Sequence, residues 1–515
     1  MISFKKIILA ALIAMPVLQA SAADGLTFDP SKGGEERTMT FLDGTTIKYR
    51  AYENLYYVTN IEDSVYQFLN IYVPEKAYNA GKGTPIFLRT YVGGYMSTTA
   101  RAPQATDASG RALLEGYVLC IPGTRGANST VTTMQGKGKK AKEVTTYTGR
   151  TPNALLDLKA AIRYLRYNDA VMPGDAEMII TDGTSAGGAM SSLMGATGNH
   201  PIYDSYLKAM GAADTRDDIW ACVCYCPITD LDHADMAYEW LYKCTNDGVR
   251  GLNAEQKAVS EEFASQYAAY INSLGLKNPK TGESLNADNF RDYIKSYLLQ
   301  SLQRGRDEGA VLPDTIGIKF YEKKRVPDEG FVPHHGPGGP GGAGMGGPGP
   351  RHMVKEQGNI IQDMDMDKYL SYVVSTIMLK TPPSFDSMDI LGARASNENQ
   401  VFGDAEGNSV HFTDYGLQKA SGNASAKLDE DMKKRVYMYN PLNFIGNKEA
   451  NTAPHWFIRH GARDRDTSFN VPVTLATKLM NYGYDVDFFL PWNRPHSGDY
   501  NLNDLFDWIQ SLLDR

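Results

Sequence analysis

Short apolar segments alternate with amphipathic stretches along much of this 515-residue chain, and this alternation is the feature that most constrains its fold. Apolar runs that end near glycine are typical of strands buried on both faces of a parallel sheet. Apolar residues spaced by three and four positions indicate helices between them. The sequence therefore predicts a doubly wound, mostly parallel α/β sheet, preceded by antiparallel strands at 46–57 and 66–74. The expected parallel strands lie at 85–91, 117–121, 177–181, 455–459 and 486–490, and the helices begin near 151, 188, 471 and 502.

The alternating pattern stops between about residues 228 and 435. This stretch contains mostly helical segments, such as 255–274 and 291–304, and little parallel-strand pattern. Within it, 13 of the 15 residues at 336–350 are Gly or Pro, a composition that predicts a flexible surface loop. We therefore expect an α/β core formed by 23–227 and 436–515, interrupted by a large, mainly helical lid insertion at 228–435.

The first 22 residues have the pattern of a signal peptide. Two lysines precede a short apolar segment at 7–18, and Ala20-Ser21-Ala22 forms a small-x-small cleavage pattern. The apolar segment is short for a membrane span, so we expect a periplasmic or secreted protein with no membrane attachment after cleavage. The formal net charge is −8, and no long block of Lys and Arg is interleaved with aromatic residues. These features argue against a nucleic-acid partner.

The five cysteines predict packing rather than metal binding. Cys222, Cys224 and Cys226 alternate as along one strand, so we expect them to share one buried face. A disulfide that uses Cys244 is the alternative. Zinc ligation is disfavoured, because no His or further Cys stands at ligand spacing, and we expect no metal site.

Residues 183–187 read Gly-Thr-Ser-Ala-Gly, which matches the G-x-S-x-G pattern around a nucleophilic serine. The pattern alone is weak, but here it follows an apolar strand at 178–180 and precedes a helix-compatible run at 189–194. A strand, a tight turn and a helix are what a nucleophile elbow requires. Ser185 is the candidate nucleophile. The alternative is a glycine-rich turn without chemistry.

A nucleophilic serine needs a base, and in hydrolases with this elbow the histidine comes last in the chain. Of the nine histidines, only His496 lies in the loop before the last helix, so it is the candidate base. A surface histidine whose hydrogen bonds are satisfied, without a catalytic role, is the alternative. The orienting acid should follow the strand at 456–458, where Asp464 is favoured over Asp466.

The oxyanion formed during acyl transfer needs two backbone N–H donors. One should belong to Ala186, directly after the candidate nucleophile. The other should come from the loop after the strand at 85–91, where either Gly93 or Gly94 can approach a substrate closely.

Several longer motifs resemble those of bacterial tannases (tannin acylhydrolases). They lie at 156–166, at 183–199 (GTSAGGAMSSL followed by GATGN), at 226–231 and at 238–240. The likeness runs from about residue 66 to the C-terminus, apart from the Gly/Pro-rich run. It implies an α/β-hydrolase with a lid that cleaves galloyl esters. Its triad would be Ser185, Asp464 and His496.

The resemblance also implies three residues that hold the phenolic hydroxyls of a galloyl ring. The lysine matches Lys380 in LKTPPSFD, the glutamate matches Glu398 in ENQVFG, and the aspartate matches Asp466. In fungal tannases and feruloyl esterases, paired cysteines adjoin the catalytic Ser and His. Here Thr184 and Pro495 stand at those positions, so that group is disfavoured.

Together these observations predict a secreted serine esterase that releases gallate from tannins or alkyl gallates without any cofactor, acting on a small phenolic ester. The alternatives are a hydroxycinnamoyl (feruloyl or chlorogenate) esterase, a general carboxylesterase, or a catalytically silent binding protein that keeps the fold. The sequence leaves the leaving alcohol, the oligomeric state and the purpose of the Gly/Pro-rich loop open.

Overall fold

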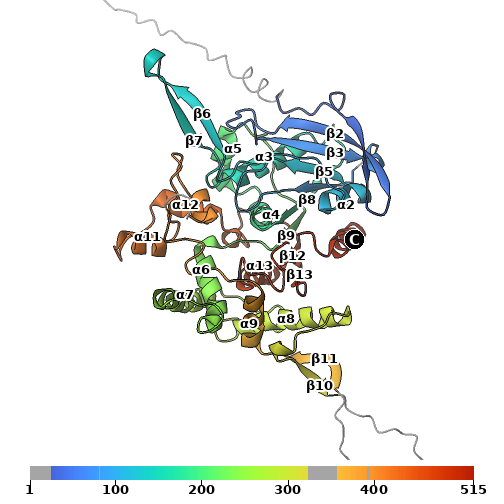
Figure 1. The fold of residues 1–515 in the computed structure, drawn as a ribbon. Coiled ribbons are helices and arrows are strands. Elements are labelled where there is room, and N and C mark those ends of the chain that lie inside the picture. The colour runs from blue at the N-terminus through green and yellow to red at the C-terminus, as the bar shows by residue number, and fades with distance from the viewer. Residues whose placement is uncertain (1–24, 80–81, 323–356, 391–394) are drawn as a thin grey trace, which may run out of the picture.

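One large sheet organises the chain, whose computed structural model describes residues 25–79, 82–322, 357–390 and 395–515 (Figure 1). Its nine strands lie in the order β1-β2-β3-β5-β4-β8-β9-β12-β13. Their bounds are β1 (Glu35–Thr40), β2 (Thr46–Tyr56), β3 (Phe68–Pro74), β4 (Pro85–Arg89), β5 (Val118–Pro122), β8 (Asp175–Thr184), β9 (Ala221–Tyr225), β12 (His455–Arg459) and β13 (Asp485–Phe489).

The sheet changes from antiparallel to parallel at β5. Strands β1, β2, β3 and β5 pair antiparallel, and β5, β4, β8, β9, β12 and β13 pair parallel. The expected parallel strands are therefore confirmed, as are the two antiparallel strands before them. Parallel neighbours require crossover connections, which helices provide here.

Helices cover both faces of the sheet, because successive apolar side chains of a strand point to opposite faces and both sets are buried. In β4, Ile86 and Leu88 belong to one apolar cluster, and Phe87, between them, belongs to the other. The first cluster includes side chains of α3, α4 and α13, and the second includes those of α2 and α14. These helices are α2 (Ala108–Glu115), α3 (Asn153–Tyr167), α4 (Ala186–Ala196), α13 (Asn470–Asn481) and α14 (Leu502–Leu513).

The stretch between β9 and β12 adds no strand to this sheet in its described part. It is mainly helical, and in Figure 1 helices α7, α8 and α9 lie beyond β12 and β13, on the side away from β2 and β3. Its elements are α6 (Leu231–Tyr242), α7 (Ala254–Ser273), α8 (Phe290–Asp307), β10 (Lys319–Glu322), β11 (Gln357–Asp363), α9 (Met366–Thr376), α10 (Asn397–Val401), α11 (Asp414–Ser421) and α12 (Glu430–Met438). The Gly/Pro-rich run at 336–350 and the predicted signal peptide at 1–22 fall outside the described residues, and the domain boundaries remain predictions.

An unexpected hairpin and a short helix complete the described elements. Strands β6 (Thr130–Gln135) and β7 (Lys142–Tyr147) pair with each other and project from the body, and α5 (Asp204–Ala209) follows α4 (Figure 1).

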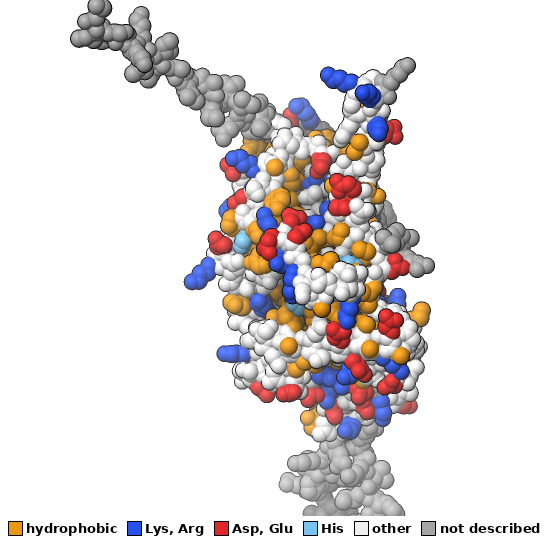
Figure 2. Space-filling view, turned by 90° about the vertical axis from the view of Figure 1, so that its left-hand side faces the viewer, with side chains coloured by type: hydrophobic (Ala, Val, Ile, Leu, Met, Phe, Trp, Pro, Cys, Tyr) orange, Lys and Arg blue, Asp and Glu red, His pale blue; other side chains and the backbone are white. Residues whose placement is uncertain are grey.

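No helix in the described ranges combines the length and apolarity needed to cross a membrane. On the face drawn in Figure 2, acidic and basic side chains are interspersed, and the basic ones form no continuous stripe.

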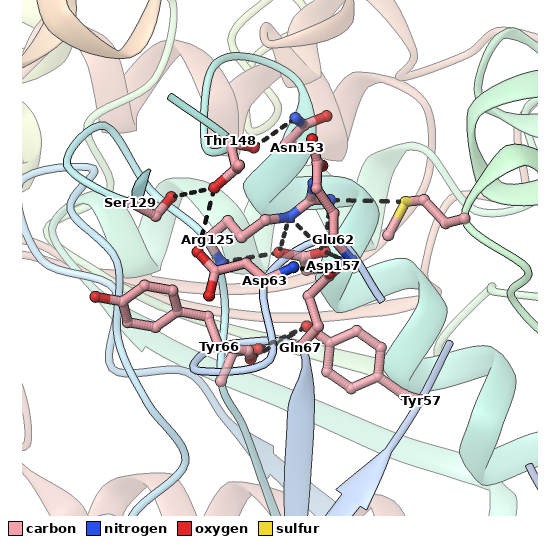
Figure 3. Close-up of polar contacts among 12 residues, drawn as sticks. Tyr57, Glu62, Asp63, Tyr66, Gln67, Arg125, Ser129, Thr148, Asn153 and Asp157 are labelled. Atoms are coloured by element: carbon pink, nitrogen blue, oxygen red, sulfur yellow. Dashed lines mark hydrogen bonds and ion pairs between the residues drawn. The ribbon is translucent and has the colours of Figure 1, made fainter. Parts of the chain in front are cut away.

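A buried charge network ties the early strands to α3 (Figure 3). Asp157 accepts hydrogen bonds from the backbone N–H and the guanidinium of Arg125 at 2.8–3.2 Å, and from the Gln67 amide at 3.2 Å. Arg125 also pairs with Glu62. Removing one partner of such a buried pair leaves an uncompensated charge, which typically costs about 3–5 kcal/mol.

All five cysteines are free thiols, so the disulfide alternative is wrong. Cys222 and Cys224 share one apolar cluster, as expected. Cys226 does not: it lies just past β9 with a φ of 44° and belongs to the other cluster. Strand β9 ends at Tyr225, so the predicted alternation of side chains between the two faces does not extend to Cys226.

Candidate active site

The candidate site lies where five adjacent parallel strands end. Gly93 and Gly94 follow β4, Ser185 follows β8, Cys226 follows β9, Asp464 follows β12 and His496 follows β13. The carboxyl ends of parallel strands share one edge of the sheet, which is where α/β folds place their ligand sites.

Ser185 occupies a strained turn between β8 and α4. Its φ is 62° and its ψ is −124°, a conformation that non-glycine residues rarely adopt. The flanking glycines make the turn possible, because a Cβ on Gly183 would lie 2.2 Å from the Gly187 carbonyl oxygen and one on Gly187 would lie 2.8 Å from that of Val92. This strand, strained turn and helix have the geometry of a nucleophile elbow.

His496 and Asp464 form a direct pair. His496 Nδ1 lies 2.7 Å from Asp464 Oδ2, and the Asp464 side chain is buried. Burial alone would raise the pKa of Asp464, but the adjacent His460 ring and the hydrogen bond from His496 lower it to about 2. The carboxylate is thus ionised at neutral pH and fixes the imidazole orientation.

The imidazole of His496 is tuned toward its protonated form. Burial lowers its pKa, but the hydrogen bond and the charge of Asp464 outweigh burial, so the pKa is raised above its usual value. A base that takes a proton from a serine must carry that proton as imidazolium, and Asp464 stabilises this state.

The histidine loop lies against the elbow. A Cβ on Gly498 would lie 1.9 Å from Thr184 Oγ1, and the Ser497 carbonyl oxygen lies 3.3 Å from Cys226 Sγ. The described hydrogen bonds include none between Ser185 and His496. Such bonds are commonly long in unliganded enzymes and shorten when substrate binds.

Three backbone N–H groups at this edge of the sheet have no acceptor among the described residues. They belong to Ala186, Gly93 and Gly94. The two glycines differ. Gly94 has a φ of 56°, and a Cβ there would lie 2.6 Å from Asn397 Nδ2, whereas a Cβ on Gly93 would meet open space. The left-handed backbone and the nearby Asn397 side chain therefore favour glycine at position 94, and both glycine N–H groups are candidate donors.

The three residues matched to a galloyl-binding set interact electrostatically with one another, and two of them also with His496. Glu398, on α10, is only 8% exposed, and burial raises its pKa, while Lys380 lowers it and Asp466 raises it further. Lys380 and Asp466 also act on the pKa of His496, in opposite directions. Asp466 Oδ2 lies 4.0 Å from His496 Nδ1. Although these residues stand far apart in the sequence, their charges act on one site.

Two residues to which the sequence pattern assigned no catalytic role adjoin the pair. His460 is fully buried, and burial lowers its pKa to about 4, so it is neutral beside Asp464, 3.5 Å away. Cys226 Sγ lies within 4.8 Å of ligand atoms of both Asp464 and His496. The sequence pattern assigned Cys226 only to packing and gave His460 no role of its own.

Among the described residues, two groups of side chains bring potential metal-ligand atoms within 4.8 Å of one another. The first group consists of Cys226, Asp464 and His496. The second consists of Asp230, Asp232 and His233. There burial lowers the pKa of His233, but the two carboxylates outweigh it and raise the pKa to about 11, so His233 is a paired cation. Asp232 and His233 line a cavity of about 930 Å³ that contains none of the predicted site residues.

Comparison with solved structures identifies the family. The tannase of Fusobacterium nucleatum superposes with a TM-score of 0.77 at 34% identity, over 95% of this chain and 99% of that one. A tannase from Lactobacillus plantarum gives a TM-score of 0.77 at 33% identity, over 96% of this chain and 100% of that one. This chain belongs to the bacterial tannase family. The resemblance seen in the sequence motifs is therefore confirmed, together with the α/β-hydrolase fold.

Two further matches agree with this tannase assignment. Residues 144–271, which include the elbow, match the family model described as BD-FAE. Esterase LipC of Mycobacterium tuberculosis is 43% identical over 69 residues, a match that spans 13% of this chain and 17% of that protein. The chain is thus a carboxylic ester hydrolase.

Proposed function

We propose that this tannase-family protein is a secreted serine esterase that hydrolyses galloyl esters and releases gallate through an acyl-enzyme. The observation that carries the proposal is the electrostatic coupling of Glu398 to Lys380 and Asp466, which in turn act on His496. A similar solved structure, described as a tannin acyl hydrolase in complex with ethyl gallate, supports it, with a TM-score of 0.76 and 34% identity over 95% of this chain and 99% of that one.

In the proposed reaction His496 takes the proton of the Ser185 hydroxyl, and the oxygen attacks the ester carbonyl. The oxyanion accepts hydrogen bonds from the N–H of Ala186 and of Gly93 or Gly94. Collapse of the intermediate expels the alcohol, which takes the proton from His496 and leaves a galloyl ester on Ser185. Water, deprotonated by His496, then releases gallate and restores the serine.

The charged residues supply selectivity for the phenolic ring. Burying three hydroxyls is costly unless each finds a partner. A lysine and two carboxylates can pair with them, and a ring without hydroxyls would leave these charges unsatisfied. A site built in this way rejects the unsubstituted analogue strongly.

The remaining parts of the proposal concern location and access. The leader at 1–22 would direct export, and the helical stretch between β9 and β12 would act as a lid that carries Lys380 and Glu398 over the sheet edge. The reaction needs neither metal nor cofactor, and its partner is a small phenolic ester.

The test is the hydrolysis of methyl gallate and methyl ferulate, assayed side by side with the purified enzyme. We expect rapid release of gallate and little release of ferulate, because ferulate cannot present three hydroxyls to the charged residues. Equal or faster cleavage of ferulate would overturn the galloyl assignment in favour of a hydroxycinnamoyl esterase, and turnover of neither ester would overturn both.

A further inference from the structure

The hydroxyl of Tyr238, on α6, joins two segments of the candidate galloyl site. It accepts a hydrogen bond from the backbone N–H of Lys380 at 3.2 Å and donates one to the carbonyl oxygen of Arg465 at 2.7 Å. Arg465 immediately precedes Asp466. One buried oxygen therefore sets the distance between the backbones that carry the lysine and one of the carboxylates.

Glu239, the next residue on α6, fixes the other side of the Lys380 peptide through Arg250, which lies in the segment between α6 and α7. Arg250 donates to the Lys380 carbonyl oxygen from Nε at 3.2 Å and from Nη2 at 2.5 Å. Its guanidinium is held by both carboxylate oxygens of Glu239 at 2.6 Å. Both polar groups of the Lys380 backbone are thus bound, directly or through Arg250, to consecutive residues of α6.

The glutamate of the site is tied to the same helix through Asp235. The Asp235 carboxylate accepts the backbone N–H groups of Ser384, Phe385 and Asp386 at 2.6, 3.1 and 2.9 Å. Asp386 in turn accepts a hydrogen bond from Asn399 Nδ2 at 2.7 Å, and Asn399 adjoins Glu398 on α10.

The Asp235 carboxylate does not serve stability through its charge. Burial raises its pKa to about 6, and the three amide hydrogen bonds offset this only in part. An acid whose pKa is raised by folding lowers the stability of the folded state at pH values above that pKa. What the buried carboxylate does provide is a fixed position for three consecutive amides.

We infer that Tyr238 and Asp235, one turn apart on α6, are positioning residues that hold Lys380, Glu398 and Asp466 at the spacing of the galloyl hydroxyls and so set the selectivity for the trihydroxyphenyl ring. The inference rests on the proposed function. Neither residue needs to touch the substrate. Hydrogen bonds to charged groups depend strongly on distance and direction, so a small shift of one backbone segment weakens recognition of the ring while leaving the serine chemistry intact.

The test compares Tyr238→Phe with the wild type on methyl gallate and methyl benzoate. The substitution removes one oxygen and keeps the ring, so the fold should persist. We expect KM for methyl gallate to rise about tenfold with kcat within about twofold, because binding to the ring is weakened. The kcat/KM for methyl benzoate should stay within about twofold. Asp235→Asn should likewise lower the ratio of kcat/KM for methyl gallate to kcat/KM for methyl benzoate.

Two matched variants separate positioning from general loss of stability. Tyr203→Phe removes an equally buried hydroxyl that donates to the Met438 carbonyl oxygen at 2.7 Å. Asp175→Asn alters a buried carboxylate that accepts two backbone N–H groups at 2.9 and 3.0 Å, at the opposite end of β8 from Ser185. Both should leave the gallate-to-benzoate ratio unchanged.

If Tyr238→Phe lowered kcat/KM equally for both esters, or changed kcat/KM for neither, the inference would be overturned while the proposed function would stand. Failure of the wild type to release gallate would overturn both.

Discussion

Replacing Ser185 with alanine is expected to lower kcat for methyl gallate by about 10⁴-fold or more. Ser185 follows directly after β8 in a strained conformation, and His496 and Asp464 form a hydrogen-bonded pair at the same edge of the sheet. Without the hydroxyl no acyl-enzyme can form, and the rest of the site can only bind the ester. Gallate release, followed by absorbance or chromatography, measures the loss.

The matched control is Ser192→Ala, in α4, the helix that follows Ser185. It removes a buried hydroxyl that donates to the Ala189 carbonyl oxygen at 2.7 Å. It should keep nearly full activity. Asp464→Asn should also lose about 10⁴-fold, because the imidazole would then lack an acceptor that holds its tautomer. Retention of more than a few per cent of wild-type kcat in Ser185→Ala would contradict the assignment of the nucleophile.

The second large effect is expected at Glu398. The Glu398→Gln variant should lose about 10- to 100-fold in kcat/KM for methyl gallate, because a hydrogen bond to a charged group contributes about 1.5–3 kcal/mol. Glu398 is buried and interacts with Lys380 and Asp466, so its charge lies within the cluster rather than on the surface. Methyl benzoate should lose little, since it offers no phenolic hydroxyl to this carboxylate. The comparison needs kcat and KM for both esters.

The control for charge removal is Glu262→Gln, which alters a carboxylate of α7 that pairs with Lys419 at 3.2 Å. It should leave both esters unaffected. If Glu398→Gln lowered the rate for both esters in equal proportion, Glu398 would have a structural role and the galloyl assignment of the site would be contradicted.

The elements that could be predicted from the sequence are those with a strong local pattern. The apolar runs of β4 and of the segment before Ser185 correctly predicted strands. The spacing of apolar residues predicted the helices that flank the sheet. The hairpin of β6 and β7 was missed because its residues are mostly exposed, so no buried face produces a pattern. Cys226 was assigned to the wrong face because the strand ends at Tyr225.

The candidate site divides in the same way. The elbow around Ser185 is continuous in the sequence, so its residues could be proposed directly. Asp464 and Asp466 are two residues apart. The sequence favoured Asp464 as the orienting acid, and in the structure the hydrogen bond from His496 goes to Asp464. The contacts that Tyr238 makes with residues 142 and 227 positions away leave no trace in any local motif. Such contacts depend on tertiary packing, which a single sequence does not reveal.

The most direct test of the central claim is to measure how the enzyme divides a galloyl group between water and an added alcohol. Methyl gallate and ethyl gallate are hydrolysed separately in the same concentration of 1-propanol, and the ratio of propyl gallate to gallate is determined for each. If both esters pass through one galloyl ester on Ser185, the ratio is the same for the two, because the leaving alcohol has departed before the division occurs. A ratio that changes with the leaving alcohol would show direct attack by water and would contradict the proposed acyl-enzyme.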